Sequence, residues 1–214
     1  KDHIIKMNIY LIKKFSPEYV CIINNDVYFS MSLIEKLESI YRELANVAFI
    51  SPVQYNLNSQ TPLSFIDLRH IPTLFDDFKT ISGIGSMSKH IYTQNCEYKD
   101  FQEVAIIPGA FLFVNYSVFE SLGFFDERTF LFCEERFIAK KAKDAGLRSF
   151  VLLNERYIHA HSVTINSETS KARQRKMLFE GKLLYTRIHR TFPLMKITLL
   201  YIAYLINKIL LTLK

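Results

Sequence analysis

Residues able to do chemistry gather in two stretches that lie far apart in this chain. In the first, an apolar run ends on the turn Asn24-Asn25-Asp26. In the second, Glu134 and Glu135 stand side by side. His159 and His161 follow them. Carboxylates and imidazoles can bind a divalent metal ion, and a carboxylate can also take a proton from a substrate hydroxyl. The sequence therefore offers the side chains for a metal-assisted group transfer.

Asp26 comes shortly after the run Tyr19 to Ile23, which is rich in β-forming residues and predicts a buried parallel strand. Ligands of open α/β sheets bind outside the carboxyl ends of the strands. A carboxylate there can hold a hard divalent cation that in turn binds diphosphate oxygens. The alternative is that Asn24-Asn25-Asp26 is only a polar turn or the cap region of the next helix.

Glu134 and Glu135 open a predicted helix over residues 134–145. Adjacent helical residues point about 100° apart, so the two carboxylates need not share a role. One could act as a general base while the other caps the helix or pairs with a cation. The alternative is that both simply complement the helix dipole at its N-terminus.

Two further features could complete a site. His159 and His161 alternate, so in a strand they face the same side and could ligate a metal; a satisfied polar role is the alternative. Residues 107–110 contain Pro108 and Gly109, a small-residue break where a ligand could approach the backbone closely. The alternative for this break is an ordinary tight turn.

The elements that would position these residues alternate between strands and helices, which predicts an α/β sheet. Predicted strands cover residues 19–23, 47–50, 104–107, 110–114, 149–153 and 157–159. Predicted helices cover residues 3–15, 32–44, 117–122, 134–145 and 170–188, the second opened by a capping box at Ser32 and Glu35. Residues 54–103 have no clear pattern and predict long loops with a few short elements.

Composition favours a globular protein, because 49% of the 214 residues are apolar and 14% are aromatic. Cys21, Cys96 and Cys133 are far apart and odd in number, so we expect reduced thiols and a cytoplasmic location. Residues 171–214 hold ten basic residues and one acidic residue, within an overall net charge of +6. The rest of the chain is therefore slightly acidic, and an anionic surface or ligand is expected near the C-terminus.

The last apolar stretch, residues 194–211, approaches the length of a membrane span but is interrupted by Lys196 and Lys208. Together with Asn207, these lysines favour a helix that lies on a membrane surface through residues 193–214. A spanning helix and a core or dimer helix are the alternatives. Nucleic acid is not expected as a partner, because the basic residues are not interleaved with aromatics as in known modules.

The order of these signals resembles that in the family 2 glycosyltransferases, which have the GT-A fold. The matching segments are Asn24-Asn25-Asp26, Gly109-Ala110, Gly123-Phe124-Phe125-Asp126-Glu127, Glu134-Glu135 and His159-Ala160-His161-Ser162-Val163-Thr164. The resemblance covers roughly residues 4–190. It is most specific over residues 107–164, which are similar to bacterial rhamnosyltransferase-like enzymes that build surface polysaccharides.

The resemblance implies transfer of a sugar, with inversion, from a nucleotide-diphosphate donor to a saccharide or lipid-linked acceptor. By position, Asp26 would bind Mn²⁺ or Mg²⁺ on the diphosphate, with His159 or His161 beside the metal. Glu135 would be the catalytic base, with Glu134 as the other candidate. The residues implied in donor or acceptor binding are Asn24, Asn25, Asp26, Gly109, Ala110 and Asp126.

This chain departs from the family pattern at Asn24, where an acid is usual, and at Glu135, where aspartate is usual. Residues 1–25 would supply only the last helix and strand of the family's N-terminal half. The resemblance thus implies an N-terminally truncated, Rossmann-like mixed sheet flanked by helices over residues 1–166, followed by a basic and apolar helical segment over 167–214. A partner chain or a second copy could complete the nucleotide pocket, and the expected location is the inner face of the bacterial membrane. The alternative is a non-catalytic half-enzyme that binds a membrane or a partner.

Overall fold

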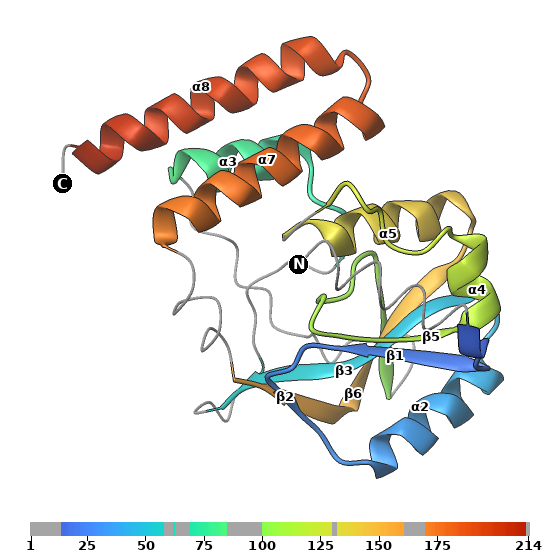
Figure 1. Ribbon diagram of the computed structural model, residues 1–214. Coiled ribbons are helices and arrows are strands. Elements are labelled where there is room, and N and C mark those ends of the chain that lie inside the picture. The colour runs from blue at the N-terminus through green and yellow to red at the C-terminus, as the bar shows by residue number, and fades with distance from the viewer. Residues whose placement is uncertain are drawn as a thin grey trace.

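The fold is a mixed α/β arrangement, seen in a computed structural model that describes residues 14–57, 62, 69–84, 100–129, 132–160 and 170–212. The strands are β1 (Tyr19–Ile23), β2 (Val27–Tyr28), β3 (Val47–Asn56), β4 (Phe101–Val104), β5 (Phe111–Asn115) and β6 (Arg148–His159). The helices are α2 (Ser32–Glu43), α3 (Leu74–Ser82), α4 (Tyr116–Ser121), α5 (Glu134–Asp144), α7 (Lys171–His189) and α8 (Pro193–Thr212). Figure 1 shows the sheet with helices on either side of it. The expected α/β class is confirmed.

The six strands form one open sheet in the order β1-β5-β3-β6-β2, with β4 also paired to β6. Only the β3 and β6 pair is parallel; the other pairs are antiparallel. Among the described strands, β1 pairs with β5 alone, so the expected buried parallel strand at 19–23 was wrong. Its apolar run reflects contacts on both faces, with Val20 and Ile22 on one side and Tyr19 on the other. Strand direction depends on a partner some ninety residues later, which the local run does not encode.

Three strand boundaries differ from expectation. β3 continues through Pro52 to Asn56 because a register shift falls between Pro52 and Val53, where the missing amide of proline is tolerated. β6 is one strand from Arg148 to His159, where two strands were predicted. β4 lies at 101–104 rather than 104–107, since Ile106 and Ile107 are buried without joining the sheet.

The helix boundaries follow the sequence more closely. α2 begins at Ser32 as predicted, but the capping box was wrong: Met31 occupies the cap position without a side-chain hydrogen bond, and the Ser32 hydroxyl contacts Ser30. α4 and α5 are followed by Gly123 and Gly146, both in the left-handed conformation that ends a helix, as predicted. The helix expected over residues 3–15 lies almost wholly outside the described residues.

Apolar side chains cover both faces of the sheet. On one face α2 packs against the sheet through Leu33, Leu37, Tyr41, Phe111, Phe113, Phe150 and Leu152. On the other, α4 and α5 pack through Phe119, Ile138, Ala139, Ala142, Phe49, Val53, Leu112 and Val151. The core therefore consists of a sheet between two helical layers, which fixes α5 against the strands.

A further helical layer consists of α3, α7 and α8 (Figure 1). Ile81 of α3, Phe179 of α7 and Leu200 of α8 pack together in its centre. α7 also contacts α5, since the rings of Phe137 and Tyr185 lie 5.2 Å apart edge to face. The C-terminal helices thus share apolar contacts with the rest of the protein. The boundary expected at residue 166 lies outside the described residues.

One buried carboxylate joins these helices. Asp77 of α3 is fully buried, and its oxygens lie 2.9 Å from Arg136 Nη1, 3.1 Å from Lys182 Nζ and 2.7 Å from Arg190 Nη2. The guanidinium of Arg136 also lies 3.8 Å from the Tyr185 ring centre. Lys182 and Arg190 were counted among basic residues expected to meet an anionic surface, but they point into the protein. We call these four charged residues the Asp77 cluster.

We expect Asp77→Asn to lower the free energy of unfolding by about 3 to 5 kcal/mol, because it leaves three buried cations without their shared counter-charge. Urea unfolding followed by circular dichroism measures the change. Glu180→Gln is the matched control: Glu180 is an exposed member of an ion pair with Lys176, and its loss should change stability by less than about 1 kcal/mol. Equal effects of the two substitutions would contradict a central role for Asp77.

Candidate functional site

Most of the predicted site residues meet at one rim of the sheet, where β1 and β6 end and β5 and α5 begin. The amide of Asn24 donates a 3.0 Å hydrogen bond to the carbonyl of Ala110. Gly109 lies against Glu135: a β-carbon at this glycine would sit 3.6 Å from Glu135 Oε2. These contacts connect three segments that are distant in the sequence.

A buried chain of hydrogen bonds ends at Asp26 on this rim. The hydroxyl of Tyr157 donates to Gln54 Oε1 at 2.7 Å, and Gln54 Nε2 lies 3.1 Å from His159 Nδ1. His159 Nε2 lies 3.0 Å from Asp26 Oδ1. Tyr157, Gln54 and His159 are each at most 8% exposed. Tyr157 and His159 are two residues apart in β6 and therefore share a face of the sheet.

The direction of this chain follows from Asp26. An ionised carboxylate only accepts hydrogen bonds, so we assign the proton to His159 Nε2, which donates a hydrogen bond to Asp26 Oδ1. Nδ1 of neutral His159 then accepts a hydrogen bond from the Gln54 side-chain NH₂ group. The Gln54 side-chain oxygen in turn accepts a hydrogen bond from the Tyr157 hydroxyl. Both ring nitrogens are engaged in this arrangement, so His159 orients the Asp26 carboxylate and offers no lone pair to a metal.

The fit of a metal ion can be judged from the donor groups present. Within the described parts of the chain, no three His, Cys, Asp or Glu side chains are grouped to hold a metal ion. Of the three expected ligands, His159 is bonded to Asp26 and His161 lies outside the described residues. Mg²⁺ is commonly held by one or two carboxylates plus substrate phosphates. Asp26 suits a site of that kind, in which the substrate supplies most of the ligands.

Glu134 and Glu135 are the first two residues of α5, as predicted. Burial, and after it the charge of neighbouring Glu134, raises the pKa of the Glu135 carboxyl from its usual value to about 7. Opposing contributions come from its own backbone amide and from Arg136. A carboxyl with a pKa near 7 is well suited to accept and release a proton near neutral pH.

The turn before α5 has an unusual backbone. Phe132 and Cys133 have φ angles of 65° and 81°, a left-handed conformation that side-chain-bearing residues rarely adopt. Gly181 of α7 packs directly against them: a β-carbon there would approach the Phe132 carbonyl to 3.1 Å and Cys133 Sγ to 3.2 Å. α7 thus helps to hold the turn that places Glu135.

The cysteines behave as small apolar side chains. Cys133 is buried and Cys21 is half-buried among apolar neighbours. Burial raises the pKa of both thiols to about 12, so neither is a thiolate near neutral pH. Cys96 lies outside the described residues.

Asp126 and Asn25 are two predicted site residues that have no side-chain contact with the hydrogen-bonded chain from Tyr157 to Asp26 among the contacts of the described residues. The Asp126 carboxylate accepts two hydrogen bonds from the Arg128 guanidinium at 2.8 and 2.7 Å, and one from the Arg128 amide. The Arg128 hydrogen bonds hold its pKa below the usual value, so it stays ionised. These contacts organise the loop after α4 and join it to no other predicted site residue. Asn25 is exposed at the turn, and its predicted role in binding stays a prediction.

Sequence patterns missed two members of the buried chain. Gln54 lies in the apolar run Val47–Tyr55, and a single polar residue in a buried strand is a signal that could have identified it. Tyr157 precedes His159 by two residues and could have been placed on the same face.

No family model and no curated protein sequence matches this chain.

The rim itself brings together one oriented carboxylate, a second carboxyl with a raised pKa, and a glycine that lies against this second carboxyl. Such a rim can bind a polyanionic group at Asp26 through a cation and remove a proton at Glu135.

The raised pKa of Glu135 makes stability depend on pH. The folded protein holds this proton more tightly than the unfolded chain, so stability falls as pH rises from 4.5 to about 7. Glu135→Gln abolishes this fall. Between pH 5 and pH 8, the free energy of unfolding of the variant should rise by about 2 kcal/mol relative to that of wild type.

Urea unfolding at the two pH values tests this. Glu43→Gln, an exposed glutamate of α2, should show no such pH-dependent gain. If the difference in free energy of unfolding between Glu135→Gln and wild type does not change with pH, the pKa of Glu135 is not raised.

Proposed function

We propose that this protein is a glycosyltransferase related to family 2, with a GT-A type of fold, that moves a sugar from a nucleotide-diphosphate donor to a saccharide or lipid-linked acceptor. The observation that carries the proposal is the meeting of Asp26, Gly109 and Glu135 at one rim of the sheet. Their order in the sequence is that of the family pattern. The mixed sheet between helical layers is compatible with this fold.

Glu135 is the proposed catalytic base. Its carboxyl has a pKa of about 7 because it is buried, so a useful fraction is ionised at neutral pH and can accept a proton. Gly109 lies against the Glu135 carboxylate and has no side chain, so a substrate could approach its backbone closely beside the proposed base. Glu134 precedes Glu135 and raises its pKa through charge repulsion.

Asp26 is the proposed donor-side residue. His159 fixes its carboxylate through a 3.0 Å hydrogen bond, and Gln54 and Tyr157 fix His159 in turn. With Asp26 and the donor phosphates as ligands, Mn²⁺ or Mg²⁺ would stabilise the negative charge of the leaving group. Asn24 and Asn25 lie in the same turn and could donate to phosphate oxygens.

The reaction balances with these groups alone. The acceptor oxygen forms a bond to the anomeric carbon of the donor sugar while its proton passes to Glu135. The bond between the anomeric carbon and the diphosphate oxygen breaks, and the nucleoside diphosphate leaves with that electron pair. Attack opposite the leaving group inverts the anomeric centre, as the family pattern implies.

Calorimetric titration with UDP and with dTDP, each with and without Mn²⁺, tests the donor side. We expect one nucleotide to bind in a metal-dependent way, and Asp26→Ala to weaken that binding at least tenfold. Asp144→Ala, at the exposed end of α5, is the matched control and should bind as wild type does. Glu135→Gln should also bind normally, because Glu135 faces the acceptor.

Absence of metal-dependent binding from folded protein would contradict the proposed enzyme. It would favour the second candidate, a non-catalytic module that binds a membrane or a partner. The exposed apolar face of α8 favours this alternative.

A membrane surface is the proposed setting of either function, because α8 is apolar on its outer face. It is the one described helix long and apolar enough to cross a membrane, and only 11% of its most apolar stretch is buried. Its exposed apolar residues include Leu194, Met195, Leu199, Tyr201, Ile202, Leu205, Ile209, Leu210 and Leu211. Exposed apolar area of this extent is typical of an interaction surface.

Two polar residues of α8 hydrogen-bond to residues outside the helix, whereas Thr198 and Lys208 are exposed. Asn207 Nδ2 donates to the Ser82 carbonyl at 3.2 Å, and Lys196 Nζ lies 3.1 Å from the Thr191 hydroxyl. Leu200 and Ala203 are buried against α3 and α7. A helix docked in this way supports a position along the surface of the inner bacterial membrane rather than across it.

We expect wild-type protein to float with vesicles of phosphatidylcholine and phosphatidylglycerol in a density gradient. The double substitution Ile202→Glu and Leu205→Glu places two charges on the outer face of α8 and should abolish flotation. Leu57→Glu changes an equally exposed leucine outside α8 and should have no effect. Flotation of the double variant at the wild-type level would exclude α8 as the membrane contact.

A further inference from the structure

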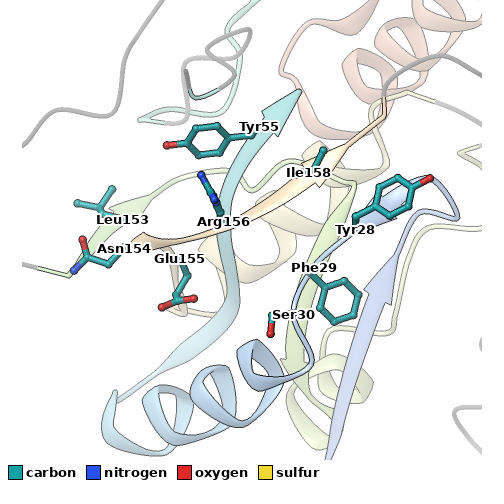
Figure 2. A pocket seen from close by; sticks show the side chains of 9 residues that line it. All are labelled: Tyr28, Phe29, Ser30, Tyr55, Leu153, Asn154, Glu155, Arg156 and Ile158. Carbon is teal, nitrogen blue, oxygen red and sulfur yellow. The ribbon is translucent and has the colours of Figure 1, made fainter. Parts of the chain in front are cut away.

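A pocket of about 660 Å³ lies along the outer edge of β6 (Figure 2). On this edge β6 pairs with β4 through residues 149–152 and with β2 through residues 158–159. Between these two pairings, no described strand lies beside β6. The pocket occupies this gap, and its volume lies within the range of small-molecule sites.

The pocket wraps around the strand edge. Tyr28, Tyr55, Arg156 and Ile158 lie on one side of β6 in Figure 2, and Phe29, Ser30 and Glu155 lie on the other. The first group shares a face because Tyr28 and Tyr55 are both register partners of Ile158. This is the face that α5 covers, since Tyr55 packs on the apolar cluster of α4 and α5.

Charge argues against an ionic ligand here. Glu155 is in an ion pair with Lys36, and the Arg156 guanidinium lies 5.8 Å from the Tyr55 ring centre. Lys36 balances the charge of Glu155, so Arg156 is the one remaining charge among the lining residues. A single cation among uncharged groups is less than phosphate and carboxylate sites with several charged donors provide.

We propose that this pocket, the β6-edge pocket, binds a neutral sugar unit of the acceptor other than the unit that reacts. Tyr28 is 61% exposed and offers a ring face on which the C–H face of a sugar can stack. Asn154, Glu155, Arg156 and Ser30 surround the rings with groups that donate and accept hydrogen bonds, as sugar hydroxyls require. This inference rests on the proposed transferase function and specifies an oligosaccharide as its acceptor.

The position of the pocket supports a role distant from the reacting hydroxyl. Tyr28 follows Asp26 by two residues, and Ile158 precedes His159. Neighbouring strand residues point to opposite faces, so the side of the pocket formed by Tyr28 and Ile158 faces away from the His159 side chain while remaining next to the Asp26 turn. An acceptor chain could therefore run from the rim along the sheet edge into the pocket.

Binding of the full chain to a printed panel of neutral bacterial oligosaccharides, followed by solution titration with the best binder, tests this inference. We expect Tyr28→Ala and Arg156→Ala each to weaken saccharide binding at least tenfold. Phe75→Ala is the matched control, because Phe75 on α3 is 64% exposed and lies outside the pocket; it should bind as wild type does. Circular dichroism confirms that the variants are folded.

Titration of the same proteins with UDP or dTDP and Mn²⁺ separates this inference from the proposed function. Nucleotide binding without binding of any saccharide, or saccharide binding unaffected by Tyr28→Ala and Arg156→Ala, would overturn the pocket assignment alone. Pocket-dependent saccharide binding without nucleotide binding would support the assignment and overturn the transferase. Binding of extended peptides in place of saccharides would show that the gap at the edge of β6 accepts a strand. This result would also overturn the assignment of the pocket to a saccharide.

Discussion

The buried carboxylate of Asp77 is the contact on which the arrangement of the helices depends. It meets cations from α5, from α7 and from the segment after α7, all in the interior. Separation of any of these helices would leave a buried charge without its counter-charge, which costs several kcal/mol. The helices around the Asp77 cluster are therefore held in one arrangement by electrostatics as well as by apolar packing.

That arrangement determines where α5 begins. Arg136 is the residue after Glu135, and its side chain is fixed by Asp77 and by the Tyr185 ring. Gly181 holds the left-handed turn at Cys133 on the other side of the helix start. Glu135 is thus placed against Gly109 by contacts from α3 and α7.

The sequence predicted the strand and helix types well where local patterns decide them, as in α5 and in the glycines after α4 and α5. It also identified Asp26, Gly109, Glu135 and His159, which the structure brings to one rim. It missed what depends on distant partners: the antiparallel direction of β1, the continuation of β3 through Pro52, and the link from Gln54 to His159. Lys182 and Arg190 looked like part of a basic surface, because their partner Asp77 lies in a stretch without a clear pattern some hundred residues earlier.

The most direct test of the proposed site is paramagnetic broadening of amide NMR signals by Mn²⁺ in the presence of the nucleoside diphosphate that binds. We expect the strongest broadening at residues 24–26, with signals of Gly109, Glu135 and His159 affected next. Broadening centred on the C-terminal helices or the β6-edge pocket, with the rim unaffected, would contradict a donor site at Asp26.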